Sequence, residues 1–205
     1  LKSDFAQPSW ATVVTIAAAL ANLTSIEFRT PGTISTSNLV VWVDEVCLLT
    51  TVQPTNTVTV TRTSTPPSSW CLMQDNIDDG NIMNANGVAW ISYSWAGSGT
   101  VSVTSQPKVD TTTGANGTAY SLMITGTNTA SDGGWGMKSP MAISNGTVNV
   151  ASNFAGVCFY VKTSVASSFR MNLETTAITD SNYWGGNFST TTSWIRWSSG
   201  GTRSS

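Results

Sequence analysis

The sequence predicts an all-β protein, and three observations support this. Charged residues make up only 10% of the 205 residues, and the net charge is −2. Strong helix formers are scarce, whereas β-branched residues and the turn formers Asn, Ser and Gly are abundant. Short runs of alternating apolar and polar residues recur between these turns, which is typical of many short strands. A chain of this length forms one or two domains.

The first block, residues 1–50, predicts three strands. The alternation of Trp10–Ile16 and Ser25–Arg29 indicates two of them, and the long apolar run Leu39–Leu48 indicates the third. Three strands in a segment this short form about half of a β-sandwich. They bury too little apolar surface to fold alone.

Residues 51–70 predict a linker, because Thr, Ser and Pro fill most of the segment. Such composition favours an extended chain that can carry O-linked glycans. The alternation of Val58-Thr59-Val60-Thr61 leaves an ordered edge strand as the alternative.

The second block, residues 71–205, predicts the main part of a β-sandwich. After Trp194 the pattern decays into a Ser- and Gly-rich tail, which predicts a loop. The expected strands are Leu72–Gln74, Ala89–Trp95, Val101–Ser105, Ala119–Thr125, Trp135–Ser139, Thr147–Val150, Gly156–Thr163 and Phe169–Glu174.

Three stretches of the second block resemble a known family. Asp75-Asn76-Ile77-Asp78-Asp79-Gly80-Asn81, followed by Trp90, is similar to the opening of carbohydrate-binding modules with a galactose-binding-like jelly-roll fold. Phe154–Lys162 resembles their central strand, and Phe188–Trp194 resembles the stretch before their final strands. Ile77 and Asp78 depart from the Phe and Glu that are usual there, and the region after Trp194 does not follow the family pattern.

The first block resembles the strands with which these modules end. Trp10–Ile16, Ile26–Phe28 and Val41–Leu48 match, in order, a strand, an "I-x-F" strand and a closing "W-I-D-D-V-x-L" strand. Phe5–Trp10 also echoes Phe188–Trp194, since both read Phe, a few small polar residues and Ser-Trp. The resemblance therefore implies a repeat in shifted frame: the end of one module, a linker and the beginning of the next.

A jelly roll without its last strands exposes an open sheet edge, which recruits another strand. The first block can complete the sandwich of its own chain. Alternatively, it can complete a neighbouring molecule, as in donor-strand complementation. The second arrangement is head-to-tail and produces a fibre or a tandem array at the cell surface, and it is the expected one.

The composition excludes several classes of function. The chain has no histidine, which excludes Ser-His-Asp and Cys-His catalysis and histidine metal sites. Its cations are scattered singly, which argues against nucleic-acid binding. The longest apolar stretch, Val13–Leu23, is too short to span a bilayer. Glu27 and Glu174 lie on alternating strands and are interpreted as a solvated face, so the chain is not expected to be an enzyme.

The resemblance implies an extracellular or cell-surface protein that binds a polysaccharide or a cell-surface glycan without catalysis. Trp95, Trp135, Tyr183 and Trp184 neighbour glycine and polar residues, which favours exposed rings on which a sugar can stack. The alternatives are packing at sheet edges or between fibre subunits. A purely structural fibre subunit with no ligand site is the second functional hypothesis.

The resemblance also implies a structural calcium ion between the opening segment and the closing strand. Its ligands would be Asp44, Asp78 and Asp79, whose hard oxygen atoms suit calcium. The alternative is an ordinary Asp, Asn and Gly turn.

The chain has three cysteines, without the spacing of a zinc site. Cys47 and Cys71 flank the linker and could form a disulfide, although spacing alone does not fix the pairing. Cys158 lies in an apolar run and is expected to be a buried free thiol.

Overall fold

The computed structural model describes residues 5–30, 36–51, 70–130, 132–142, 146–181 and 183–198. These residues form one short helix and eleven strands. Their bounds are α1 Ile16–Ala21, β1 Leu23–Arg29, β2 Thr36–Thr50, β3 Trp70–Asp75, β4 Ile91–Trp95, β5 Val101–Asp110, β6 Ser121–Asn128, β7 Gly134–Pro140, β8 Phe154–Thr163, β9 Ser167–Thr175, β10 Trp184–Thr190 and β11 Ile195–Ser198.

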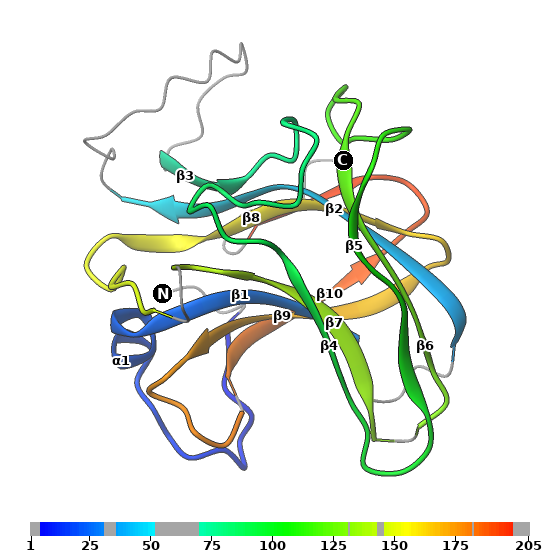
Figure 1. The fold of residues 1–205 in the computed structure, drawn as a ribbon. Helices are drawn as coiled ribbons and strands as arrows, with labels where there is room; N and C mark the ends of the chain where they lie inside the picture. Colours follow the sequence, from blue (N-terminus) through cyan, green and yellow to red (C-terminus); the bar gives the residue numbers. More distant parts are fainter. Residues whose placement is uncertain are drawn as a thin grey trace.

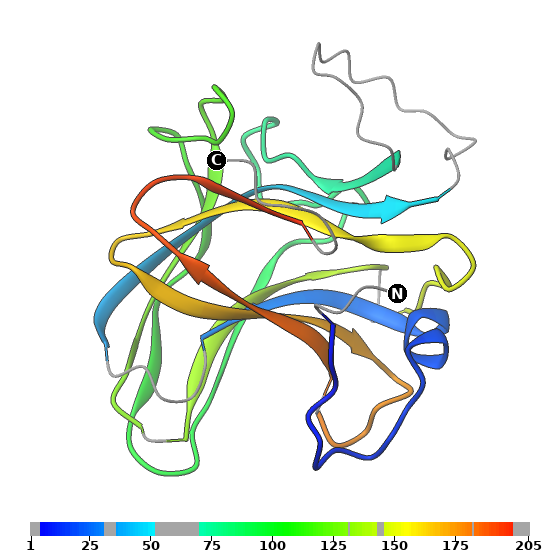
Figure 2. The same cartoon turned by 180° about the vertical axis from the view of Figure 1, so that it is seen from behind.

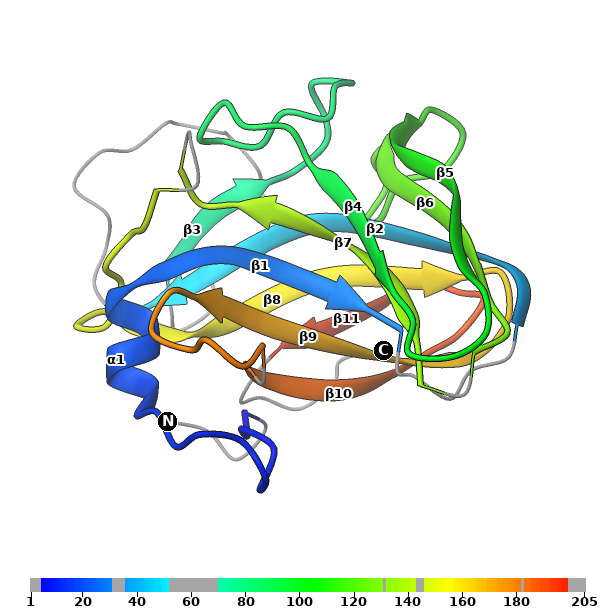
Figure 3. The same cartoon turned by 60° about the horizontal axis from the view of Figure 1, so that its bottom comes forward.

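Two antiparallel sheets pack face to face as a β-sandwich (Figure 1). The five-stranded sheet has the order β10-β9-β1-β7-β4, and the six-stranded sheet has the order β11-β8-β2-β6-β5, with β3 also paired to β2. Figure 3 shows the five-stranded sheet from its outer side, with α1 at one end of β1. The predicted all-β class and the sandwich are therefore confirmed.

The first block supplies a central strand to each sheet. β1 pairs with β7 on one side and with β9 on the other. β2 pairs along one side with β8, and along the other with β6 and β3. In the described structure these strands therefore lie inside the sandwich of their own chain.

The core between the sheets is rich in aromatic rings. Phe28 of β1 meets Phe159 of β8 with ring centroids 4.7 Å apart, which joins the two sheets at the centre. Phe188 and Trp197, from β10 and β11, pack against the same Phe159 ring. Because both blocks contribute to this one core, neither buries its apolar residues without the other.

The strand expected at Trp10–Ile16 is wrong. Most of this segment is irregular, and α1 begins at Ile16. Thr15 caps the helix by accepting a hydrogen bond from the Ala18 N–H at 3.2 Å. The alanines of the sequence Ile16-Ala17-Ala18-Ala19-Leu20-Ala21 have high helix propensity, which outweighs the short alternation before them.

The end of the chain also differs from the expectation. The stretch after Trp194 forms β11, which pairs with β8, and residues Trp184–Thr190 form β10. Figure 2 shows the chain passing from β10 in one layer to β11 in the other. A strand therefore directly follows the second copy of the Phe…Ser-Trp motif, which ends at Trp194. The first copy, which ends at Trp10, is followed by an irregular segment and α1. Thr147–Val150 forms only an isolated bridge, between Val148 and Leu23.

Candidate functional site

The outer side of the five-stranded sheet carries a concentration of charge that is unusual for this weakly charged chain. Because side chains alternate along a strand, β1 points Ile26 and Phe28 into the core and its polar residues outward. The register places outward residues of neighbouring strands side by side. This polar face comprises Ser25, Glu27 and Arg29 of β1, Lys138 of β7, Arg170, Asn172 and Glu174 of β9, and Ile91, Tyr93 and Trp95 of β4.

Lys138 of β7 and Glu174 of β9 form an ion pair on the polar face. Lys138 Nζ donates hydrogen bonds to both carboxylate oxygens of Glu174, at 2.9 and 2.8 Å. Ser25 Oγ donates to Oε2 of the same carboxylate. The side chains of Lys138 and Glu174 keep 24% and 20% of their surface exposed, so a ligand can reach them.

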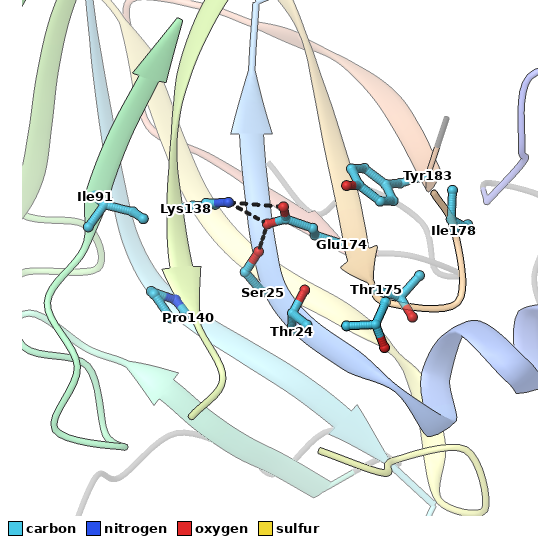
Figure 4. Close-up of a pocket in the computed structure, with 10 residues that line it drawn as sticks. Thr24, Ser25, Ile91, Lys138, Pro140, Glu174, Thr175, Ile178 and Tyr183 are labelled. Carbon is cyan, nitrogen blue, oxygen red and sulfur yellow. Dashed lines mark hydrogen bonds and ion pairs between the residues drawn. The ribbon is translucent and has the colours of Figure 1, made fainter. Parts of the chain in front are cut away.

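These residues line a pocket of about 390 Å³. Figure 4 shows the ion pair in the middle, Ile91 and Pro140 on one side, and Tyr183 and Ile178 on the other. Thr24, Thr175 and Thr176 add further lining atoms. A few convergent polar groups between apolar walls and an aromatic ring are the usual composition of a small-molecule site.

A buried polar network extends from the pocket along the same face. The Asn172 Nδ2 atom donates to Glu27 Oε1 at 2.9 Å, and Arg29 Nε lies 3.8 Å from that oxygen. Arg170 Nε donates to Asn172 Oδ1 at 2.8 Å. The Arg170 guanidinium also reaches Asn187 Oδ1 and two backbone carbonyls, those of Ala6 and Tyr183. Each buried charge on this face therefore has polar partners, as desolvated charges require.

Two aromatic rings of the edge strand β4 lie flat beside this network. Tyr93 and Trp95 stack at a centroid distance of 5.9 Å and an interplanar angle of 15°. They lie over Gly136 and Gly134 of β7, where an added Cβ atom would fall 2.8 Å from the Tyr93 hydroxyl and 2.3 Å from the Trp95 ring. The glycines leave the space that these rings occupy.

Charged side chains lie close to both of these rings. The guanidinium carbon of Arg29 lies 5.3 Å from the centroid of the Trp95 ring, which is a cation–π contact. Burial, together with the nearby negative charge of Glu27, raises the pKa of Tyr93 well above its usual value. Tyr93 is therefore a neutral phenol at physiological pH.

The four predicted sugar-stacking residues are not brought together on one surface. Trp135 is fully buried, at 0% exposure, so its predicted role as an exposed platform is wrong. It points inward from β7 and packs over Gly126 of β6. Trp184 is half-buried and donates from Nε1 to the Val14 carbonyl, so it anchors the N-terminal segment. Trp95 lies on the polar face, and Tyr183 lines the pocket.

In the described residues, the predicted calcium ligands accept hydrogen bonds from donors of the protein itself. Asp44 is fully buried, and its oxygens accept hydrogen bonds from the Glu45 N–H, the Ala115 N–H and Thr118 Oγ1. Asp78 and Asp79 bond instead to Asn76 and Asn81 of their own turn. Within the described ranges, no group of three acidic, histidine or cysteine side chains is placed to hold a metal ion. The Asp, Asn and Gly turn is thus hydrogen-bonded within itself, and the structural calcium ion stays a prediction.

Asp75 is the buried acid of the opening segment. It accepts hydrogen bonds from the Ile77 N–H at 2.9 Å and from Trp90 Nε1 at 2.6 Å. Trp90 is 2% exposed and stacks on Phe28, so it belongs to the core. The opening motif thus ties the turn before β4 to the sandwich interior.

Cys47 of β2 and Cys71 of β3 form a disulfide, with Cα atoms 5.5 Å apart. Cys158 is a buried free thiol that packs beside Cys47 on the neighbouring strand β8. Burial raises the pKa of the Cys158 thiol. The disulfide links the two blocks on either side of the segment 51–70, whose predicted linker structure lies largely outside the described residues.

The six-stranded sheet carries a second aromatic cluster on its outer side. Lys162 Nζ lies 4.7 Å from the Trp42 ring centroid and 5.1 Å from that of Trp194. It donates to Thr113 Oγ1 at 2.6 Å, and Trp42 Nε1 donates to Asp110 Oδ2 at 2.7 Å. Trp42 is therefore half-buried on the outer side of the sheet and does not belong to the core between the sheets. The cation and the indole N–H groups bond within the cluster, so it is a packing arrangement.

Sequence reasoning named Tyr183 as a sugar-stacking residue but missed the ion pair of the pocket. Ser25, Lys138 and Glu174 are far apart in the chain, and no motif joins them. The one available signal was the alternation of polar residues on Ser25–Arg29 and Phe169–Glu174, which marked two outward faces without showing that they are adjacent.

The described part of the chain contains no helix that is both long and apolar enough to cross a membrane. Comparison with protein-family models, with curated proteins and with solved structures finds no match for this chain.

Proposed function

We propose that the protein is a non-catalytic binding module that takes a polysaccharide on the polar face of its five-stranded sheet. The observation that carries the proposal is the pocket around Lys138 and Glu174, in which a donor and an acceptor lie between Tyr183 and the apolar walls. Sugars present both hydroxyl groups and apolar ring faces, and this composition is complementary to both.

The arrangement of the carboxylates supports binding over hydrolysis. A glycosidase needs two carboxyl groups that reach the scissile bond. The face carries Glu27 and Glu174, but Glu27 is only 5% exposed and receives the Asn172 hydrogen bond. Glu174 is held by Lys138 and Ser25. Incubation with a bound polysaccharide is therefore expected to release no new reducing ends.

The jelly-roll assignment and the extracellular location are part of the same proposal. The chain alternates repeatedly between the two sheets, with β1, β7 and β9 in one and β2, β6 and β8 in the other, which agrees with a jelly roll. The Cys47–Cys71 disulfide supports an oxidising compartment, since such bonds persist mainly in secreted and cell-surface proteins.

Affinity electrophoresis through gels that contain dissolved polysaccharides tests the proposed function. Lys138→Ala removes a charged donor and Tyr183→Ala removes the pocket ring, so each is expected to weaken binding about tenfold or more. Trp194→Ala is the matched control, because this aromatic residue directly precedes β11 and belongs to the cluster on the outer side of the six-stranded sheet. Unretarded migration of the wild-type protein in every polysaccharide, neutral or acidic, would refute the proposal.

The predicted head-to-tail fibre is the alternative to a sandwich completed within one chain, and the disulfide provides a sharp test of it. Cys47 belongs to the first block and Cys71 to the second. If the first block completed a neighbouring molecule, this bond would join two chains. A non-reducing denaturing gel of such assemblies would show a ladder of covalent oligomers. We expect a single monomer band, because β2 and β3 pair within one chain.

A further inference from the structure

We infer that the ligand of the polar face is a neutral polysaccharide, recognised through its hydroxyl groups, and not an acidic one. The inference rests on the proposed function and names the substrate class of the same site. It is argued from how the charges of the face are partnered.

The cation of the pocket is compensated by its own carboxylate. Lys138 donates two hydrogen bonds, and both go to Glu174. A carboxylate or sulfate group on a sugar would have to approach Lys138 beside the negative charge of Glu174. The attraction and the repulsion largely cancel, so the pocket offers little net potential for an anion.

The two arginines of the face are also engaged. Arg29 lies beside the buried carboxylate Glu27 and over the Trp95 ring. Arg170 donates to four oxygens, from Asn172, Asn187, Ala6 and Tyr183. Recognition of an acidic sugar by arginine uses a bidentate fork aimed at the ligand. The guanidinium of Arg170 instead braces the N-terminal segment and the loop before β10.

The same groups suit an uncharged hydroxyl. An ammonium group has three donor hydrogens, and a carboxylate has about four acceptor positions. In the described structure Lys138 uses two of its donors, and Glu174 accepts three hydrogen bonds. One donor and one acceptor therefore remain side by side. A sugar hydroxyl, which both donates and accepts, can satisfy the pair without displacing the ion pair.

Matched polymers test the inference. The wild-type protein would be run through gels containing hydroxyethylcellulose or carboxymethylcellulose, and galactan or polygalacturonate, at about 0.05 and 0.5 M NaCl. We expect retention by a neutral polymer that exceeds retention by its acidic counterpart and changes less than about twofold with salt. Stronger retention by the acidic polymers that falls as salt rises would overturn the inference and leave polysaccharide binding intact. No retention by any polymer would remove the proposed function, and the inference with it.

A charge-changing variant sharpens the test. Glu174→Gln keeps the shape of the side chain but leaves Lys138 without its counter-charge. We expect about tenfold weaker binding of the neutral polymer and new, salt-sensitive retention by the acidic one. Asp110→Asn is the matched control, since it removes one negative charge on the other sheet and is expected to change neither. Undiminished neutral binding by Glu174→Gln, together with unchanged behaviour on acidic polymers, would contradict the assigned role of the ion pair.

Discussion

Replacing Trp135 with alanine is expected to lower the free energy of unfolding by about 3–5 kcal/mol, the usual cost of truncating a large buried aromatic residue. Trp135 is the largest fully buried side chain of the described structure. Its ring meets Phe169 edge-on at a centroid distance of 6.5 Å and lies directly over Gly126. Removing it leaves a cavity between the two sheets, which their rigid hydrogen-bond ladders cannot close. Urea unfolding followed by far-ultraviolet circular dichroism measures the change.

Two control variants separate burial from other effects of losing a tryptophan. Trp10→Ala removes a ring that is 79% exposed, and we expect a change of less than about 0.5 kcal/mol. Trp135→Phe should cost less than Trp135→Ala, because in the described residues the Trp135 Nε1–H donates to no acceptor and only volume is lost. A loss below about 1 kcal/mol for Trp135→Ala would show that the ring does not fill the core, and would revive its predicted role as a surface platform.

The stability of the protein is expected to fall as the pH rises from about 4 to about 8, opposite to the trend of most paired carboxylates. Burial raises the pKa of Asp44 from 3.8 to about 7, against the opposing effect of its hydrogen bonds from Ala115, Glu45 and Thr118. Burial likewise raises the pKa of Asp75 from 3.8 to about 6, although Ile77 and Trp90 donate to it. Both acids hold their protons more tightly in the folded chain than in the unfolded chain.

The direction of the effect follows from proton binding. Between the unfolded and folded pKa values the native state binds more protons, so the free energy of unfolding decreases with pH. The contribution is complete below about pH 4 and is lost as the pH passes through the folded values. One pKa unit corresponds to about 1.4 kcal/mol, so Asp44 alone accounts for a loss on the order of 4 kcal/mol. Urea unfolding at a series of pH values in this window measures it.

Variants of the two acids test the assignment through the slope of the profile. Asp44→Asn and Asp75→Asn remove the titrating groups, so the double variant should show a nearly flat dependence between pH 4 and 8. Its absolute stability is not the readout, because an amide nitrogen cannot accept the bonds that a carboxylate oxygen accepts. A wild-type stability that stays level or increases over this range would show that neither carboxyl group is protonated in the folded chain near neutral pH.

The sequence by itself determined much of the secondary structure. Alternation located β1 and β9, and the long apolar run marked β2. Local chemistry was enough here because a strand with one buried face must repeat with a period of two. The solvated face expected for Glu27 was wrong, because this side chain is only 5% exposed. The same reasoning failed at Trp10–Ile16, where the alternating pattern was too short to outweigh the alanines that follow.

Which residues form the pocket was determined only by the tertiary structure. The period of two shows that Ser25 and Glu174 point outward, but not that β1 lies between β7 and β9. That pairing brings together Ser25, Lys138 and Glu174 from separate parts of the chain. The burial of Trp135 on β7 depended on the strand pairing as well. Its flanking glycines suggested exposure, yet they lie on the outer face to seat Tyr93 and Trp95, while the tryptophan between them points inward. Pairing between distant strands depends on the whole core, and no local pattern records it.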